Sequence, residues 1–525
     1  MKSKFFALIV FSSIILLPKF VQAQDENLFD INNIKANLEF LASDELEGRE
    51  ATTRGARIAS LYIAMQLQKY GIKPFGDNGT YFQNFKMSIT GYDTASTIQI
   101  TDPVKEIINQ FAYATDFGRG GRGSAASGNL IFTSGLVFAG YGISAPEFEY
   151  DDYKDLDVAG KTVLLLSGEP YSEDSTFFDG EDDTRYSRGS YKIENAKNKG
   201  AVAVLYLPSE RSIQYWRFFM MWSKSLSFSL PDTSEEESNA ESIPAFLLSE
   251  SMAESIFSSE EKSYQDIKSL VEQNEIPFAF YLNKDIKFNV ISIGEIKDAR
   301  NVVGIIEGND PVLKNEYVSF GAHYDHEGIH NGVVYNGADD DGSGTVAILE
   351  TAKAFALSKQ NKRSVVVFFH TGEEKGLLGS SYSANHISYI NNIVANINID
   401  MVGRESIDSI YCIGSDKLST ELHNIVEDAN KETVNFYLDY SFDDPNDPQR
   451  LYYRSDHINY ARKGIPIVFF YDYMMQDYHK PTDDVDKINF EKILKTVKLV
   501  YNIGLEIANL DHRLVVDKKE EMTRN

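Results

Sequence analysis

The chain of 525 residues contains a single cysteine, Cys412, so it cannot form an internal disulfide. A zinc site built on thiolates is excluded for the same reason, and any metal must be held by histidine, aspartate and glutamate. Histidine is also unevenly placed, because all nine histidines lie between His323 and His512. Chemistry that needs an imidazole is therefore confined to the last two fifths of the sequence.

Positive charge is also in short supply. The chain has 51 lysines and arginines against 78 aspartates and glutamates, and its formal net charge is −27. This balance argues against nucleic acid and anionic lipid surfaces as partners, and it suits cationic or amine-bearing ligands.

Long apolar runs are rare, and the most apolar one lies at residues 5–17. Lys2 and Lys4 precede it and "VQA" follows at 21–23, a pattern typical of a secretory signal peptide at 1–23. This run is too short to span a bilayer comfortably, and no other segment is long enough. We therefore expect a secreted or periplasmic chain without a membrane span, whose net charge falls to −30 when the signal's three lysines are removed.

Behind the signal, the pattern of apolar residues changes twice. Residues 33–75 have apolar positions at three- and four-residue spacing, which indicates helices. Short β-like runs separated by acidic, serine- and glycine-rich connections then indicate an inserted, mostly β domain. The expected division is a signal at 1–23, the first part of the main domain at 24–115, the insert at 116–285, the rest of the main domain at 286–512 and a charged tail at 513–525.

From residue 301 onward, apolar runs of strand length alternate with helical patterns. Runs such as "EYVSFGAHYD", "RSVVVFFHTGEE" and "IPIVFFYDY" are apolar without interruption, which is typical of strands covered on both faces. The sequence therefore predicts an α/β fold with a mixed, mainly parallel sheet and helices on both faces.

Polar side chains recur where these runs end. They are, in chain order, His323, Asp325, Glu373, Glu374, Asp400 and His479. Ligands of open α/β sheets bind outside the carboxyl ends of the strands, so we expect these residues to share one site. A lone histidine or aspartate at a strand end is more often a helix cap or a surface residue, but the joint set favours a metal site.

The types of side chain in this set select the metal. Two histidines and several carboxylates without a thiolate suit one or two zinc ions, whereas calcium prefers oxygen ligands only. In the pair Glu373–Glu374, one glutamate can bind metal while the other faces the bound water. A free carboxylate that is desolvated beside an anionic cluster should have a raised pKa, which suits a general base.

The stretch "DDDGSGTVAILE" at 339–350 offers a competing interpretation, because it nearly matches a calcium EF-hand loop. An EF-hand needs an incoming helix, but "GIHNGVVYN" before the loop indicates extended or turn structure. Glu350 at the last loop position lies within a predicted helix. A zinc pair is therefore favoured over calcium at the three aspartates.

Six short motifs occur in one order: "GAHYDHEG", "NGADDDGSG", "HTGEEKGLLGS", "NINIDMVG", "RSDH" and "YHKPTDD". Together they resemble the co-catalytic zinc aminopeptidase family, whose distant relatives include glutamate carboxypeptidase and the transferrin receptor. Residues 41–67 resemble the N-terminal segment of that family. Residues 137–165 resemble the protease-associated domain that many members carry as an insert.

The resemblance implies a fold of the zinc exopeptidase type and a site for two zinc ions. Asp340 would bridge both ions. His323 and Asp400 would complete one site, and Glu374 and His479 the other.

The same resemblance implies roles for the residues around the metals. Glu373 would be the general base, and Asp325 would orient His323. Similar enzymes have a cis peptide bond at the position of Asp340–Asp341. Further residues at matching positions are Tyr478 and Arg454 as substrate contacts, and Asp456 and His457 as supporting residues.

The function that these motifs imply is an aminopeptidase that removes N-terminal residues from peptides or proteins. A glutaminyl cyclase with one zinc and a carboxypeptidase-like relative stay open as enzymatic alternatives. A non-enzymatic scaffold like the transferrin receptor is disfavoured, because all five ligands and the base are present. The preferred side chain and the oligomeric state are not encoded in any motif.

The remaining histidines and two unusual segments have plainer interpretations. His326, His330 and His370 lie close to the motifs but are not expected to be ligands, and His386, His423 and His512 are expected to pack or face solvent. The aromatic stretch 215–222 is expected to pack on its own domain, with a lid or subunit contact as the alternative. The acidic stretch 439–450 is expected to be a solvated turn, with a structural calcium site as the alternative.

Overall fold

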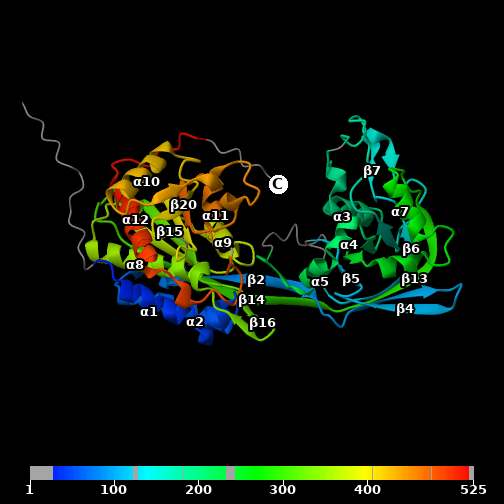
Figure 1. Ribbon diagram of the computed structural model, residues 1–525, viewed down its shortest axis with the longest axis horizontal. Coiled ribbons are helices and arrows are strands. Elements are labelled where there is room, and N and C mark those ends of the chain that lie inside the picture. The colour runs from blue at the N-terminus through cyan, green and yellow to red at the C-terminus, as the bar shows by residue number, and fades with distance from the viewer. Residues whose placement is uncertain are drawn as a thin grey trace, which may run out of the picture. The chain divides into compact units, whose positions relative to one another are not determined.

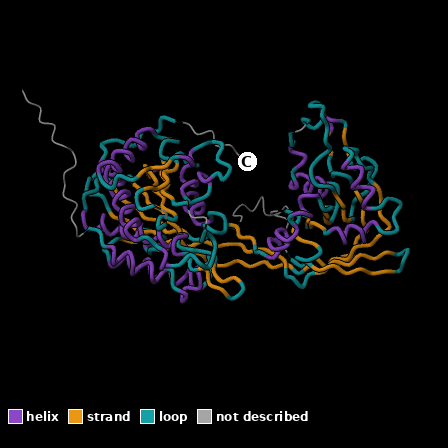
Figure 2. The backbone as a smooth tube through the Cα atoms, in the orientation of Figure 1, coloured by secondary structure: helices purple, strands orange, loops and turns teal. Residues whose placement is uncertain are grey.

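The computed structural model of the chain describes residues 28–121, 128–180, 182–231, 243–404, 406–473 and 476–518. It contains two compact units, which are shown in Figures 1 and 2. Residues up to Phe85 and from Ala299 onward form the first unit, and Lys86–Asp298 form the second. The predicted signal peptide at 1–23 lies outside the described residues.

A mixed sheet forms the centre of the first unit. Its strands run in the order β14 (Ser292–Ile306), β18 (Ser364–His370), β15 (Tyr317–His323), β19 (Ile393–Asp400), β22 (Ile467–Tyr471), β20 (Ser409–Ile413) and β21 (Tyr437–Asp439). The four central strands β18, β15, β19 and β22 are parallel to one another. Strands β14 and β20 pair antiparallel to β18 and β22. The prediction of a mixed sheet is confirmed, and its parallel part is the centre formed by the four strands β18, β15, β19 and β22.

Within the described residues, three further strands belong to this ten-stranded sheet, and one of them, β11 (Ser227–Ser229), pairs antiparallel with Ser88–Thr90 of β2 (Phe82–Tyr92). Strand β1 (Lys73–Pro74) pairs antiparallel with β14. Strand β2, like β14, contains the residues at which the chain passes from one unit to the other. The connection between the units is therefore made of extended chain in both directions.

Helices cover both faces of this sheet, as predicted. Strand β18 is buried throughout, and its alternate side chains enter two different apolar cores. Val365 and Val367 pack with α1 (Ile31–Leu41), α2 (Arg54–Lys69), α8 (Gly344–Ser358), α10 (Thr420–Glu432) and α12 (Phe490–Asn509). Val366 and Phe368 face the opposite core, to which α11 (His457–Ala461) contributes, and α9 (Leu378–His386) contacts α11. Burial on two sides explains the uninterrupted apolar runs.

An eight-stranded sheet forms the second unit. Its order is β4 (Ile107–Ala112), β3 (Thr97–Asp102), β13 (Phe280–Val290), β6 (Leu130–Phe138), β9 (Thr162–Leu165), β10 (Ala203–Tyr206), β12 (Ala245–Leu248) and β5 (Phe117–Arg119). The helices in its described part are α3 (Gly189–Asn198), α4 (Glu210–Gln214), α5 (Trp216–Lys224), α6 (Glu250–Phe257) and α7 (Tyr264–Glu272). The unit is wider than the expected insert at 116–285, because β3 and β4 join its sheet through β13.

The aromatic stretch 215–222 largely coincides with helix α5. Trp216 and Phe219 pack against the core of their own unit, and Trp216 Nε1 donates to the carbonyl oxygen of Thr115 over 3.2 Å. Phe218 and Met221 on the same helix are exposed. This packing agrees with the plainer of the two interpretations for one face of the helix.

The acidic stretch 439–450 forms local turns that its own aspartate side chains stabilise. The carboxylates of Asp439, Asp444 and Asp447 each accept a hydrogen bond from the backbone N–H group two residues further on. Of the expected tail at 513–525, residues 513–518 are described, and Leu514 is buried in the core of the first unit. Within the described ranges, no helix is long and apolar enough to cross a membrane.

Candidate metal centre

Six residues converge at the carboxyl ends of the parallel strands. His323 and Asp400 are the last residues of β15 and β19, and Glu373 and Glu374 lie three and four residues after the end of β18. Because these three strands are parallel neighbours, their ends meet at one edge of the sheet. Asp340 lies in the irregular turn Ala338–Ser343 before α8, and His479 lies in the loop after β22.

One half of the site surrounds the His323 ring. Its Nε2 atom lies 3.4 Å from Asp340 Oδ1, 3.5 Å from Asp400 Oδ1 and 3.8 Å from Glu373 Oε2. His323 Nε2 and Asp400 Oδ1 are buried, and neither makes a hydrogen bond with the described residues. Buried polar atoms are rarely left unpaired, so this arrangement suits a cation between the imidazole and the carboxylates.

The other half of the site surrounds His479. Its Nε2 atom lies 3.0 Å from Glu374 Oε2 and 3.3 Å from Asp340 Oδ2, and it too makes no hydrogen bond within the described part of the chain. The two oxygens of Asp340 therefore face two different histidines. This is the geometry that a carboxylate needs to bridge two ions.

Asp325 lies behind His323, although its contact differs in detail from the expectation. His323 Nδ1 donates to the backbone carbonyl oxygen of Asp325 over 3.1 Å, whereas the Asp325 carboxylate oxygen Oδ1 is 3.8 Å away. That carboxylate accepts the backbone N–H of Glu373 over 3.3 Å. Asp325 thus contacts both a candidate ligand and the candidate base.

The three consecutive aspartates have different partners, which the sequence did not reveal. Asp341 accepts the backbone N–H groups of His323 and Met401, both over 3.1 Å, and so joins two strand ends. Asp339 accepts the N–H of Gly403 over 2.7 Å. The peptide bond Asp340–Asp341 is cis, as the resemblance implied.

The two adjacent glutamates have opposite electrostatic environments. Burial, together with repulsion from Glu374 and Asp400, raises the pKa of Glu373 well above its usual value. Although burial opposes it, the hydrogen bond from His326 and the imidazole of His479 hold the pKa of Glu374 well below its usual value. Glu374 therefore stays ionised as a ligand should, and Glu373 has the proton affinity that a general base needs.

Three further residues contact the site although the sequence did not predict a role for them. His326, which was not expected to be a ligand, is fully buried, and its Nδ1 atom lies 2.8 Å from Glu374 Oε1. Arg49 is buried and donates to the carbonyl oxygens of Tyr324 and Gly337, which flank the site in sequence. Asp483 accepts the N–H of Asp340 over 3.1 Å. All three lie within stretches that the sequence marked, His326 in "GAHYDHEG", Asp483 in "YHKPTDD" and Arg49 in residues 41–67, but no motif indicated their contacts.

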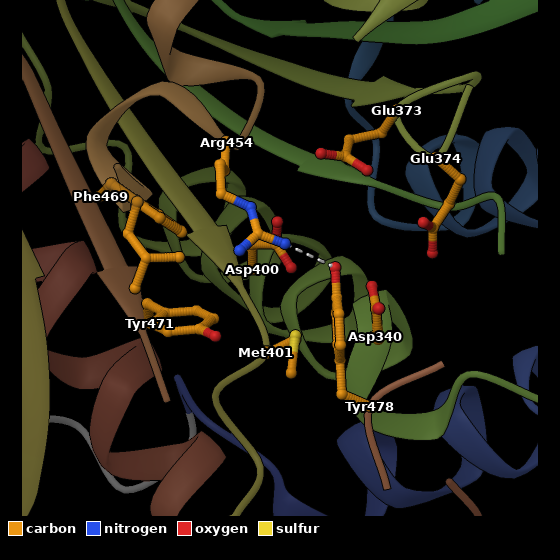
Figure 3. Close-up of a pocket in the computed structure, with 10 residues that line it drawn as sticks. Asp340, Glu373, Glu374, Asp400, Met401, Arg454, Phe469, Tyr471 and Tyr478 are labelled. Atoms are coloured by element: carbon orange, nitrogen blue, oxygen red, sulfur yellow. Dashed lines mark hydrogen bonds between the residues drawn. The ribbon is translucent and has the colours of Figure 1, made fainter. Parts of the chain in front are cut away.

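A pocket opens beside the two glutamates (Figure 3). Its lining consists of Asp340, Glu373, Glu374, Asp400, Met401, Leu451, Arg454, Phe469, Tyr471 and Tyr478. Arg454 Nη2 donates to the hydroxyl oxygen of Tyr478 over 3.2 Å, which Figure 3 marks with a dashed line. Burial raises the pKa of Tyr478, so its hydroxyl stays protonated at neutral pH.

The other histidines contact residues that are not candidate metal ligands. His370 is buried and stacks on Phe368, and His457 Nε2 donates to the carbonyl oxygen of Tyr452. The remaining ones, each with a polar contact of its own, are His330, His386, His423 and His512. The positions of His386, His423 and His512 agree with the expectation that they pack or face solvent.

Comparison with known proteins identifies the same part of the chain. Residues 301–503 match peptidase family M28, and residues 126–256 match the PA domain. The peptidase match covers the part of the chain that forms the candidate site. All five candidate ligands and Glu373 lie within this match, and the PA match lies within the second unit.

Curated relatives of the chain include two fungal proteins. A probable leucine aminopeptidase of Arthroderma otae is 30% identical over 209 residues, which are 38% of this chain and 56% of that protein. Leucine aminopeptidase 2 of Trichophyton rubrum is 28% identical over 187 residues, which are 35% of each chain. The matched part of the chain thus spans about half of the first relative's length and about a third of the second's.

Among solved structures, an aminopeptidase from Aneurinibacillus sp. strain AM-1 has the same fold. The TM-score is 0.55 at 19% sequence identity, and the likeness covers 94% of this chain and 97% of the other. At this identity the comparison supports the fold, and the chemistry must be argued from the site itself.

Proposed function

We propose that the chain is an aminopeptidase that depends on two zinc ions. The observation that carries the proposal is the position of Asp340, whose two oxygens face His323 and His479 separately. The donor set fits zinc, because it combines two imidazoles with carboxylates and contains no thiolate. His323 and Asp400 would hold one ion, Glu374 and His479 the other, and Asp340 both. Zinc, when bound, supplies Lewis acidity to the attacking water and to the scissile carbonyl group.

Glu373 moves the proton in the proposed reaction. Its Oε2 atom faces the ligand His323 without lying within hydrogen-bond distance, and its backbone is held by Asp325. The carboxylate accepts a proton from the attacking water and returns it to the leaving amine. Its raised pKa, caused first by burial, supports this role.

Tyr478 and Arg454 act on the other side of the pocket. The protonated hydroxyl of Tyr478 donates to the oxygen on which charge develops in the transition state. Arg454 contacts that hydroxyl and so fixes the direction in which it points. Both residues line the same pocket as Glu373, which supports their role as substrate contacts.

The acidic balance of the chain supports an amine-bearing substrate. The chain has 78 aspartates and glutamates against 51 lysines and arginines, and such a balance attracts a protonated N-terminus. Met401, Leu451 and Phe469 supply an apolar wall, which favours an apolar N-terminal side chain. Nothing observed at the site favours the cyclase or carboxypeptidase alternatives.

A panel of aminoacyl p-nitroanilides, assayed with and without a chelator, tests the proposal. We expect hydrolysis of substrates with a free amine, loss of activity after chelation and recovery with zinc. N-acetylated substrates serve as the control and should not be cleaved. Cleavage of an N-blocked peptide at its C-terminus, or cyclisation of an N-terminal glutamine without hydrolysis, would contradict aminopeptidase activity.

We also propose that the chain is exported to the periplasm or the medium. The support is the charged and apolar pattern of residues 1–23. N-terminal sequencing of the protein recovered from each cell fraction tests this, and an intact Met1 in the cytoplasmic fraction alone would contradict it.

A further inference from the structure

His326 is a fully buried imidazole directly beside the candidate ligands. Its Nδ1 atom lies 2.8 Å from Glu374 Oε1 and 3.8 Å from Asp340 Oδ2. An ionised carboxylate can only accept hydrogen bonds, so Nδ1 carries the proton and donates a hydrogen bond to Glu374 Oε1.

The contacts of His326 differ from those of the ligand candidate His479. His479 Nε2 lies within 3.3 Å of oxygens from two different carboxylates, Asp340 and Glu374, without hydrogen-bond geometry. His326 Nδ1 approaches only one oxygen at hydrogen-bond distance. The first pattern is that of a metal ligand, and the second is that of a hydrogen-bond donor to a ligand.

The two oxygens of Glu374 are thereby separated in function. Oε1 accepts the hydrogen bond from His326, while Oε2 faces His479 over 3.0 Å. Only Oε2 is left toward the space that His479 and Asp340 share. A carboxylate without such a donor could rotate and present either oxygen, or both.

The His326 ring packs closely against the backbone at Gly337. A Cβ atom at Gly337 would lie 2.4 Å from Cγ and 2.6 Å from Cδ2 of His326, so only glycine permits this contact. Arg49 donates to the carbonyl oxygen of Gly337 over 2.9 Å and to that of Asn336 over 2.6 Å. The carbonyl oxygen of Arg49 itself accepts the N–H of His326 over 3.4 Å. His326 is thus held both through its backbone N–H group and through its ring.

We propose that His326 is a positioning residue, which fixes Glu374 through the Nδ1–H hydrogen bond and leaves Oε2 as the single oxygen for metal. The inference rests on the proposed zinc-dependent function. Loss of a group that hydrogen-bonds a metal ligand typically lowers metal affinity about 10–100-fold. We expect this loss at one zinc ion, the one held by Glu374, and little change at the other.

Zinc titration of the purified full-length chain in competition with a chromophoric chelator tests the inference. His326→Leu removes the donor, whereas His326→Asn has nearly the same shape and places an amide N–H where Nδ1 lies. In His326→Leu, we expect one of the two zinc dissociation constants to rise about 10–100-fold. In His326→Asn, we expect both constants to stay within a few-fold of the wild-type values.

His386→Asn is the matched control, because His386 is an exposed histidine of the same unit whose recorded polar contact is to its own helix. If His326→Leu does not fold, as circular dichroism would show, His326→Gln replaces it. Glutamine keeps an amide but places it near the Nε2 position, so it should lose the same zinc ion.

Two results would overturn the inference. The first is unchanged affinity for both zinc ions in His326→Leu or its glutamine replacement. The second is an equal loss in His326→Asn, which would show that the ring itself, and not its hydrogen bond, matters. Failure of the proposed function is distinguishable from both results. If the wild-type chain binds no zinc, the inference falls with the proposed zinc dependence, whereas a zinc-binding chain without aminopeptidase activity would leave the inference to be decided by the titration alone.

Discussion

At the residue scale, the chemistry depends on how two neighbouring glutamates differ. They share a loop after β18 and are both largely shielded from solvent, yet the pKa of Glu373 is raised and that of Glu374 is lowered. Glu374 accepts a hydrogen bond from His326, whereas the nearest imidazole nitrogen recorded for Glu373, His323 Nε2, is 3.8 Å away and the charges of Glu374 and Asp400 repel its carboxylate. Because both residues are glutamates, only their contacts distinguish Glu373 as the candidate base from Glu374 as the candidate ligand.

Replacing Glu373 by glutamine tests the assignment of the base. Glutamine keeps the shape but cannot accept the proton, so we expect kcat to fall about 10²–10⁴-fold. Zinc content, measured by atomic emission, should stay at the wild-type value. Glu374→Gln is the comparison and should lose zinc. Retention of near-normal turnover in Glu373→Gln would remove this residue as the base.

Replacing Tyr478 by phenylalanine tests the oxyanion donor. The ring stays, but the hydroxyl that Arg454 contacts is lost, so kcat should fall about 100-fold or more. Because the hydrogen bond is used in the transition state, KM should change little. A rise in KM with unchanged kcat would instead assign Tyr478 to substrate binding alone.

At the scale of elements, the N-terminal segment braces the site from a distance along the chain. Arg49 precedes α2, and its guanidinium donates to backbone carbonyls that lie up to 288 positions away. Tyr324 and Gly337, whose carbonyls it binds, stand next to Asp325 and shortly before Asp340. The strand end after β15 and the turn before α8 are thus tied to the same side chain.

Removal of this guanidinium should destabilise the first unit. Arg49→Met keeps most of the volume but leaves several buried carbonyl oxygens without a donor, so the free energy of unfolding should fall by about 3 kcal/mol or more. Chemical denaturation followed by circular dichroism measures the change. Arg54→Met, at the start of the adjacent helix α2, serves as the exposed comparison. An equal, small effect of both substitutions would refute the bracing role.

At the scale of the whole molecule, groups with strongly shifted pKa values occur in both units and not only at the candidate site. The site is in the first unit, while the second contains a buried lysine, Lys192, whose Nζ donates to the carbonyl oxygen of Leu166 over 2.9 Å. Burial lowers the pKa of Lys192 from 10.5 to about 7, although the charges of Asp152 and Glu169 oppose the shift. Burial also raises the pKa of Asp152 to about 6, below the range in which Lys192 titrates.

The stability of the second unit should therefore rise with pH between about 7 and 10. In this range the unfolded state binds the lysine proton and the folded state does not, so the free energy of unfolding rises by at most about 1.4 kcal/mol per pH unit. Both tryptophans, Trp216 and Trp222, lie in this unit, and their fluorescence during urea unfolding reports on it. Lys192→Met should remove the slope, and a slope that survives this substitution would exclude Lys192 as its cause.

The sequence by itself determined the ligand types, the order of the strands' polar ends and the mixed sheet with its parallel centre. These properties are local, because a strand covered on both faces must be apolar throughout and a polar residue at its end is visible in one stretch of sequence. Only the tertiary structure decided the duties of Asp341, His326 and Arg49. Their partners lie between 18 and 288 positions away in the chain, and no spacing rule connects residues that meet only when the sheet and its surrounding turns have formed.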